Sequence, residues 1–388
     1  MFFGRRQELE EVIRILRGHF QDRVTVIHGR RRVGKTSLLF QLKQGNPELL
    51  GIPILQEIQH LYVPVLLSFE RVTAENKTWE VYYYIYRNIQ QELDLAGIQS
   101  LSISMTDFRD LSADALLENF ILDVIRQLRA NNQKLLLMSD EFDNLIRIKG
   151  EERGLFGFIR ELIVRHGEHI SFIFVGADEL VGMMKTRANR LYSMAGTPLE
   201  IQDLTPEEAG LLITEPMRKV NPKFEWADGA IRLVIALTVG NPYYIQTICD
   251  RVINNLVAGK RLRATTLDVE QAVKETLEHI GDLADILSNS NLEEKVVLSC
   301  MADIAHYEAK GRNWVTSSNI EQKICDLSST FPVKQIPAIC RSLQMRYIVG
   351  QRAESDLELE YSIRVPLLRI HIQNTLKLRD TLREGGYL

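Results

Sequence analysis

Eight residues near the N-terminus have the types and spacing of a phosphate-binding loop. Residues 24–27 (VTVI) before them read as a buried strand, and residues 37–42 (SLLFQL) after them begin a helix. A strand, a glycine-containing loop and a helix in this order let backbone N–H groups and a helix N-terminus surround a phosphate. The sequence therefore predicts a site for a nucleoside triphosphate. The motif, G-x-x-x-x-G-K-[ST], reads Gly29-Arg30-Arg31-Arg32-Val33-Gly34-Lys35-Thr36.

Two side chains of this loop have distinct predicted tasks. Lys35 would reach the β- and γ-phosphates, so we also count it as catalytic, and the Thr36 hydroxyl would bind Mg²⁺. We interpret the run of three arginines as solvated loop charge that assists phosphate binding, although an oligomer could present it to DNA. The residues expected to contact the nucleotide are Gly29, Arg32, Val33, Gly34, Lys35, Thr36 and Ser37.

A second motif follows Lys134 and the apolar run 135–138 (LLLM), which is typical of a parallel strand buried on both faces. Asp140 would hold Mg²⁺, and Glu141 would orient and polarise the attacking water. The alternative is a solvated strand end. Asp143 could be structural, helix-capping or catalytic, and the sequence leaves these open.

Three further charged residues follow the next buried strand, residues 170–176. Asp178 could sense the γ-phosphate, and N-capping of the next helix is an equal alternative. Arg187 or Arg190 could reach the γ-phosphate of a neighbouring subunit as an arginine finger. The alternative for both arginines is ordinary surface charge.

Composition limits the class of protein. The chain has 388 residues, enough for two or three domains, with 45% hydrophobic and 25% charged residues. A net charge of −4 excludes a polycation that coats nucleic acid. No signal peptide and no apolar run long enough to span a membrane stand out, and the cysteines form no C-x-x-C pair. We expect a cytoplasmic protein with reduced thiols and no membrane contact.

The order of predicted elements indicates three domains. Strands alternate with helices up to residue 202, which predicts a doubly wound α/β domain at 1–203, with a polar connector at 98–112. Helices at 207–219, 227–237, 242–258 and 268–279 predict an all-helical domain at 204–284, and residues 281–291 read as a hinge. Helices at 292–306, 317–326 and 333–345, strands at 346–349 and 359–363, and a helix from Pro366 predict a winged helix at 285–388.

The predicted winged helix contains a candidate DNA-binding stretch. No acidic residue occurs from Leu327 to Ala353, whereas the wing that follows is acidic. Contact with double-stranded DNA and a protein-contact or autoinhibitory role both stay open. The candidate DNA-binding residues are Lys334, Arg341, Arg346 and Arg352.

Four stretches together resemble the AAA+/STAND group of P-loop ATPases: residues 3–9 (FGRRQEL), the phosphate-binding loop, residues 137–143 (LMSDEFD) and residues 240–246 (GNPYYIQ). The chain is similar to archaeal and bacterial STAND-like ATPases, with archaeal replication initiators and transposon target-selection ATPases as more distant relatives. The resemblance covers nearly the whole chain, as ATPase core, helical lid and winged helix.

The resemblance implies further nucleotide contacts. Gly4 and Arg5 would lie near the adenine. Gly240, Asn241 and Pro242 would bring the lid helix over the nucleotide; the alternative is a plain helix start. Many AAA+ lids carry an arginine sensor at this helix start, where this chain has Tyr243 and Tyr244. This departure favours a slow switch over a fast ATPase.

Two functions fit these observations. The first is a switch that binds ATP and Mg²⁺, hydrolyses ATP slowly to ADP, assembles with itself into a ring or filament on double-stranded DNA, and recruits partner proteins. An arginine acting between subunits would favour it. The second is a STAND signalling ATPase that ADP holds closed, with the winged helix used for autoinhibition or protein contacts. We favour the first.

Overall fold

The computed structural model describes residues 3–18, 24–148, 152–185, 191, 194, 196–277, 279–307, 314–355 and 358–388. The chain forms two compact units, residues 2–202 and 203–388. The boundary between the units lies next to the end of the predicted α/β domain. The second unit contains both the predicted helical domain and the predicted winged helix.

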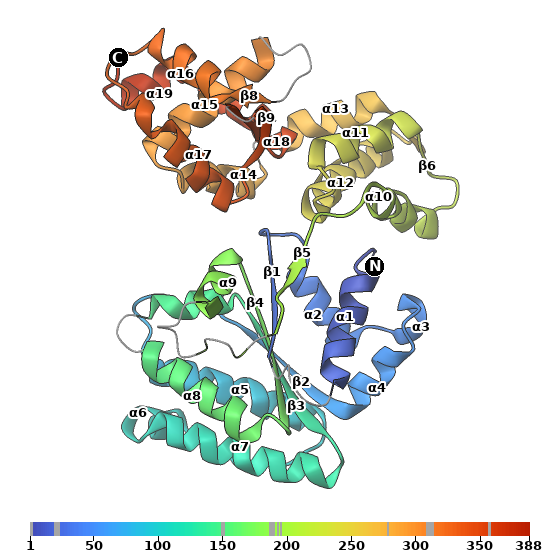
Figure 1. Cartoon of the computed structure of the whole chain (residues 1–388). Helices are drawn as coiled ribbons and strands as arrows, with labels where there is room; N and C mark the ends of the chain where they lie inside the picture. The colour runs from blue at the N-terminus through green and yellow to red at the C-terminus, as the bar shows by residue number, and fades with distance from the viewer. Residues whose placement is uncertain are drawn as a thin grey trace. The chain divides into compact units, whose positions relative to one another are not determined.

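The first unit is built on a parallel five-stranded sheet (Figure 1). Strand β1 lies inside the sheet, and later strands flank it on both sides, which makes the domain doubly wound as predicted. The strands, in spatial order, are β2 (Tyr62–Ser68), β3 (Lys134–Asp140), β4 (Ile170–Gly176), β1 (Val24–Gly29) and β5 (Leu199–Ile201).

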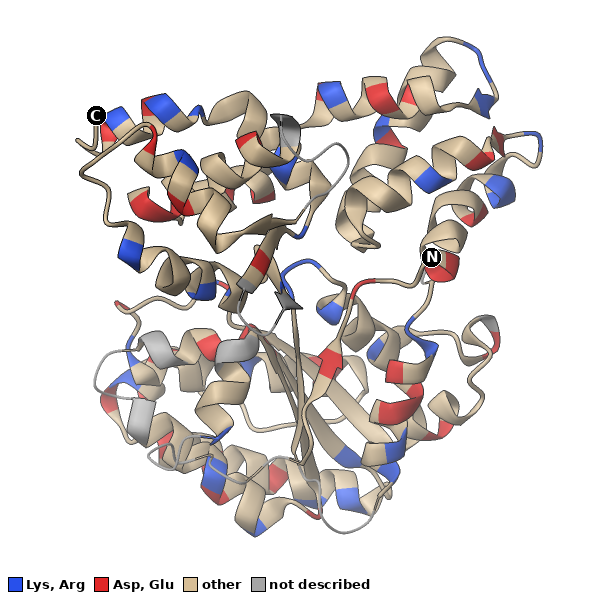
Figure 2. Cartoon of the chain, turned by 45° about the horizontal axis from the view of Figure 1, so that its top comes forward, with Lys and Arg blue, Asp and Glu red and all other residues tan. Residues whose placement is uncertain are grey.

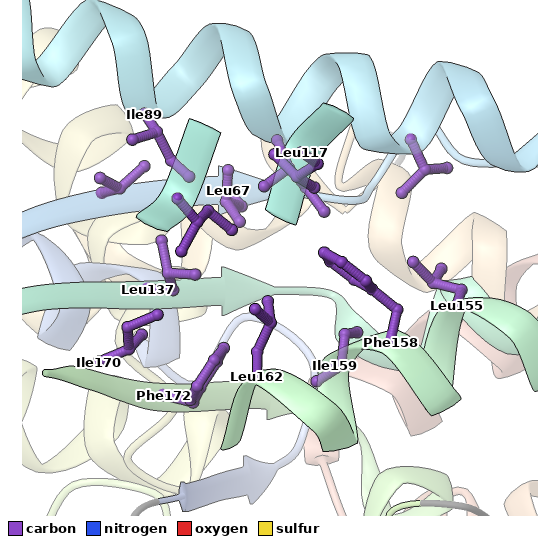
Figure 3. Packing of buried hydrophobic residues seen from close by; sticks show 14 of the residues in the cluster. Leu67, Ile89, Leu117, Leu137, Leu155, Phe158, Ile159, Leu162, Ile170 and Phe172 are labelled. Carbon is purple, nitrogen blue, oxygen red and sulfur yellow. The ribbon is translucent and has the colours of Figure 1, made fainter. Parts of the chain in front are cut away.

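Helices cover both faces of this sheet because each inner strand is apolar on both sides. In β3, Leu135 and Leu137 belong to one hydrophobic cluster, and Leu136 and Met138 belong to another. The first cluster includes buried residues of α5 (Thr78–Leu95), α6 (Met105–Asp110), α7 (Ala113–Ala130), α8 (Glu152–His166) and α9 (Asp178–Lys185). The second includes buried residues of α1 (Arg6–Arg17), α2 (Lys35–Gln44) and α4 (Ile54–Leu61). Figure 3 shows Leu137 and Phe172 of two strands beside Leu117 and Leu162 of two helices.

Several elements of the first unit differ from the sequence prediction. The expected connector 98–112 contains helix α6, which begins at a capping box formed by Ser104 and Asp107. Helices α3 (Pro47–Leu50) and α4 were not predicted, and a 3₁₀ helix, η1 (Phe142–Arg147), follows β3. Short amphipathic helices such as these carry too few apolar repeats to be recognised by periodicity.

The second unit begins with a helical bundle. Its helices are α10 (Pro206–Val220), α11 (Asp228–Thr238), α12 (Pro242–Ala258) and α13 (Thr266–Thr276), with a small parallel sheet of β6 (Glu225–Trp226) and β7 (Arg263–Ala264). The predicted hinge at 281–291 was wrong, because residues Gly281–Ser288 form helix α14. The sequence of this segment is polar, but one face of the helix is packed in the structure. Leu283 and Leu287 are buried, and buried Asp282 accepts a hydrogen bond from the hydroxyl of Tyr244 at 2.7 Å.

The C-terminal elements have the order of a winged helix. They are α15 (Leu292–Tyr307), β8 (Val315–Thr316), α16 (Ser317–Cys325), η2 (Val333–Gln335), α17 (Ile336–Met345), β9 (Val349–Ser355), β10 (Glu358–Ile363), α18 (Pro366–Thr375) and α19 (Leu378–Glu384). The three strands pair antiparallel in the order β8-β10-β9. Strand β9 starts later than the predicted residue 346, because Arg346 caps α17 and Tyr347 has a positive φ of 56° that turns the chain. None of the described helices is long and apolar enough to cross a membrane.

Candidate active site

Gly29 ends β1 and begins the phosphate-binding loop, at a position that only glycine can occupy. Its φ is +144°, and a Cβ built on it would lie 2.4 Å from the carbonyl oxygen of Ile201 in β5. Gly34, with a φ of +102°, then precedes the first residue of α2. The loop therefore turns between a strand and a helix N-terminus, the geometry in which backbone N–H groups can surround an anion.

Lys35 is the first residue of α2 and is 8% exposed. Its ammonium group donates hydrogen bonds to the carbonyl oxygens of Gly29 and Arg30, both at 2.9 Å. These neutral acceptors hold a buried positive charge inside the loop. Phosphate oxygens would be stronger partners, because their negative charge adds an attraction that a neutral carbonyl does not supply.

Thr36 and Asp140 join the two sequence motifs. The Thr36 hydroxyl donates to Asp140 Oδ2 at 2.6 Å, from the start of α2 to the end of β3. Asp140 is 6% exposed, and its Oδ1 accepts a hydrogen bond from the backbone N–H of Glu141 at 3.1 Å. A hydroxyl and a carboxylate oxygen held together in this way fit Mg²⁺, a hard cation that takes oxygen ligands and is usually shared with phosphates. The described residues contain no group of three or more His, Cys, Asp and Glu side chains suited to a metal.

Glu141 follows β3 in a left-handed conformation, with a φ of 53°, which is uncommon for a residue with a side chain. Burial raises the pKa of its carboxyl, and the negative charges of Asp143 and Asp140 raise it further. Lys35 and Arg31 oppose this increase. A carboxylate with a raised pKa is a better proton acceptor, which is what a general base for water needs.

Two contacts of the residues that follow Glu141 could not be found from the sequence. A Cβ on Gly176, the last residue of β4, would lie 2.5 Å from Asp143 Oδ1, so the glycine makes room for that carboxylate. Asn144, which is 7% exposed, donates from Nδ2 to the carbonyl oxygen of Phe69 at 3.2 Å. Nothing in the residue types indicates either contact, because both depend on the register of neighbouring strands.

Arg5 has a structural task beside the loop. Its guanidinium donates to the carbonyl oxygen of Val33 at 3.1 Å and to that of Gln202, and it pairs with Glu8 at 2.9 Å. The side chain is thereby bound to protein groups and supports the phosphate-binding loop. The expected position of Gly4 and Arg5 near an adenine stays a prediction.

The structure describes the side chains of only some of the remaining predicted site residues of the first unit. Arg32 is half-buried with a positive φ of 60°, and Ser37 is exposed in the first turn of α2. Asp178 begins α9, but its side chain lies outside the described part of the chain, as do Arg187 and Arg190.

The lid helix start lies in the second unit. Gly240 has a φ of +76°, and a Cβ on it would lie 2.2 Å from the carbonyl oxygen of Leu204. Asn241 is 2% exposed and caps α12 by accepting hydrogen bonds from the N–H groups of the next two tyrosines, and Pro242 is the first residue of the helix. These contacts define a firm helix start, and its approach to a nucleotide stays a prediction.

The structure does not bring the four predicted DNA-binding residues together as free charges. Arg346 pairs with Glu294 at 2.8 Å, and Arg352 pairs with Glu360 at 2.5 Å and lies over the Trp314 ring. Two others, Lys334 and Arg341, are exposed. Figure 2 shows Lys and Arg interspersed with Asp and Glu along most helices of the chain.

Comparisons with known proteins agree with this geometry. Residues 17–184 match the family described as AAA domain. The Walker-type ATPase PABY2304 of Pyrococcus abyssi is 15% identical, with a TM-score of 0.68 over 96% of each chain. The Aeropyrum pernix ORC2 protein, in ADPNP–ADP complexes, is 18% identical, with a TM-score of 0.67 over 98% of this chain and 94% of that one.

At these identities the structural likeness establishes the fold alone. No curated protein sequence matches the chain. The parallel sheet, the phosphate-binding loop and the matched residues 17–184 together carry the assignment. The chain therefore contains an AAA domain and has the fold of an AAA+ P-loop ATPase.

Proposed function

We propose that the chain is a molecular switch that binds ATP with Mg²⁺ and hydrolyses it slowly. The observation that carries this proposal is the 2.6 Å hydrogen bond between Thr36 and Asp140, which places the hydroxyl of the phosphate-binding loop against the carboxylate of the buried strand. Lys35 and Glu141 flank this pair in the sequence. These four groups are those that phosphoryl transfer to water requires.

Each side chain has one step in this mechanism. Lys35 exchanges its two loop carbonyls for phosphate oxygens. Thr36 and Asp140 would hold Mg²⁺, which when bound would neutralise charge on the phosphates. Glu141 would orient a water molecule and accept its proton as the water oxygen bonds to the γ-phosphorus and the bond to the β–γ bridging oxygen breaks, which releases ADP and phosphate.

Slow turnover is supported by the lid helix start. The position where the resemblance places an arginine sensor carries Tyr243 and Tyr244. Tyr244 is buried, and its hydroxyl donates to Asp282 within the same unit. Tyr244 stabilises the lid through this hydrogen bond, but unlike an arginine it supplies no positive charge to stabilise the transition state.

We further propose that the ATP state assembles into a ring or filament on double-stranded DNA and recruits partner proteins in the cytoplasm. Lys334 and Arg341 support the DNA contact, because both are exposed on the winged helix. Arg187 and Arg190 are the candidates for a contact between subunits.

A second candidate function is a switch that ADP holds closed and that a protein signal opens. The pairing of Arg346 with Glu294 and of Arg352 with Glu360 favours it, because paired arginines contribute little to phosphate binding. The winged helix would then contact protein.

The molar mass in solution separates the two functions. We would measure it with ADP or a non-hydrolysable ATP analogue, each with and without duplex DNA, and use Lys35→Ala as the control that cannot respond to nucleotide. Assembly that needs both the ATP analogue and DNA is the expected result. A monomer under all four conditions would exclude DNA-dependent assembly and favour the closed switch.

A further inference from the structure

A cavity of about 580 Å³ lies at the carboxyl end of β2, where no predicted nucleotide contact is found. Its walls include Phe69, Glu70, Arg71, Asn76, Glu80 and Tyr84, and we refer to it as the β2-end cavity. Ser68, which also lines it, is paired in the sheet with Asp140 of β3. The cavity therefore opens at the sheet edge that carries the catalytic carboxylates, and its volume is that of a small-molecule or side-chain site.

Two polar groups of the cavity are fixed in place. Glu80 Oε2 accepts hydrogen bonds from the backbone N–H of Lys77 at 2.9 Å and from Asn76 Nδ2 at 3.2 Å. The Tyr84 hydroxyl accepts a hydrogen bond from the backbone N–H of Ser68 at 2.9 Å. Its ring meets the Phe69 ring edge to face, with 5.8 Å between centroids. A preformed site of this kind loses little conformational entropy when a ligand binds.

The lining favours a planar cation. The lining residues include two with carboxylates, Glu70 and Glu80, and one with a guanidinium, Arg71, beside the half-buried ring of Tyr84. Carboxylates pair with a guanidinium through two parallel hydrogen bonds, and aromatic rings stack against it. We propose that the β2-end cavity binds an arginine side chain of a partner protein.

The cavity is linked by hydrogen bonds to the catalytic glutamate. The Phe69 N–H donates to the carbonyl oxygen of Asp140 at 3.0 Å, and the Phe69 carbonyl accepts from Asn144 Nδ2 at 3.2 Å. The backbone N–H of Asn144 in turn donates to the carbonyl oxygen of Glu141 at 3.0 Å. A partner that shifts Phe69 thus shifts Glu141, so binding changes the rate of ATP hydrolysis; this consequence rests on the proposed function.

The binding test uses the full chain and a capped tripeptide, acetyl-Gly-Arg-Gly-amide, followed by changes in the NMR signals of the tyrosine rings. We expect saturable binding in the millimolar range, with acetyl-Gly-Ala-Gly-amide as the inactive control. Glu80→Gln keeps an oxygen for the two hydrogen bonds from Lys77 and Asn76 but removes the charge, so it should weaken binding about tenfold. The control is Glu75→Gln, which changes an exposed acidic residue of the same loop outside the cavity lining and should leave binding of the arginine peptide unchanged.

Other outcomes overturn parts of the proposal. Equal binding of the arginine peptide by the Glu80→Gln and wild-type chains would remove the cavity as its site. Equal binding of a lysine peptide would exclude selection of a guanidinium. Binding of a single-stranded oligonucleotide that Arg71→Ala abolishes would make the cavity a nucleic-acid site.

Hydrolysis measured with and without saturating arginine peptide tests the link to Glu141. Peptide binding without a change in rate overturns the link and leaves the binding site. Absence of hydrolysis in both conditions contradicts the proposed function, and the binding result still stands.

Discussion

The phosphate-binding loop and the stretch from Leu327 to Ala353 in the predicted winged helix are both rich in basic residues, but the structure gives those residues different partners. In the loop, Lys35 is buried and bonded to two neutral backbone carbonyls. In the winged helix, Arg346 and Arg352 are each bonded to a carboxylate. A cation held by neutral groups still gains from an incoming phosphate, whereas a cation already paired with an anion gains much less.

The comparison shows that the number of basic residues in a stretch is a poor guide to anion binding. The stretch from Leu327 to Ala353 contains four basic and no acidic residues, yet the acids that pair with two of them come from α15 and β10. Spatial partners therefore decide which charges remain available to a ligand.

The largest effect we expect is on hydrolysis in the first unit. Glu141→Gln removes the proton acceptor but keeps the size of the side chain, so the hydrolysis rate should fall by about 10²–10⁴ with ATP binding retained. Phosphate release in single turnovers measures the rate. A variant that hydrolyses ATP at the wild-type rate would show that Glu141 is not the base.

Lys35→Ala tests whether the buried loop cation, which donates to two backbone carbonyls, contributes to nucleotide binding. The loss of a charge-assisted contact to two phosphates should weaken ADP and ATP binding at least about 100-fold, measured by titration calorimetry. Lys223→Ala, an exposed lysine of the second unit, is the control and should bind as wild type. If Lys35→Ala bound ADP and ATP with wild-type affinity, the contrast between Lys35 and the arginines paired with carboxylates would be wrong.

Arg346→Ala tests the opposite case in the winged helix. Glu294 is 6% exposed, and it would lose its cationic partner while keeping the hydrogen bond from Ser342 at 2.7 Å. Because Arg346 itself is 30% exposed, we expect a loss of about 1–3 kcal/mol in the free energy of unfolding. Thermal unfolding measures it, and Arg341→Ala, at an exposed residue of the same helix, should change it by less than about 0.5 kcal/mol.

The smallest expected effect is on the pH dependence of hydrolysis. The pKa of Glu141 is raised by burial and by Asp143 and Asp140, so its base form is lost at a higher pH than for an ordinary glutamate. Asp143→Asn removes one neighbouring negative charge, which lowers that pKa and moves the acidic limb of the kcat profile to lower pH. Asp110→Asn, in α6, is the control and should leave the limb in place. A limb that moves to higher pH in Asp143→Asn would contradict the charge argument.

The sequence was informative where structure follows from local pattern. The alternation of apolar strands and helices predicted the doubly wound sheet. The apolar run before Asp140 predicted that this carboxylate lies at a strand end, and in the structure it accepts a hydrogen bond from the Thr36 hydroxyl at 2.6 Å. Both features can be predicted because hydrophobic periodicity and the phosphate-binding motif are patterns of residues that are close in the sequence.

Contacts between distant segments could not be predicted. Most of the hinge expected at 281–291 is helix α14, whose Asp282 accepts a hydrogen bond from Tyr244, a residue far away in the sequence. The sequence makes Arg346 a candidate DNA contact because its partner Glu294 lies outside the acid-free stretch. The bond between Asn144 and Phe69 arises from the pairing of β2 and β3, and a single sequence does not contain this register.

The contacts on either side of the short link between the two units determine which insertions and substitutions the chain can tolerate there. The backbone of Gly29 touches the carbonyl of Ile201 in one unit, and that of Gly240 touches the carbonyl of Leu204 in the other. Gln202 and Asp203 alone separate these two carbonyls along the chain. Each glycine contacts a carbonyl of its own unit, so a residue inserted between Gln202 and Asp203 would lengthen the link and leave both contacts in place. We expect such an insertion to preserve the fold of each unit, whereas a side chain at position 29 or 240 would disrupt the unit that contains it.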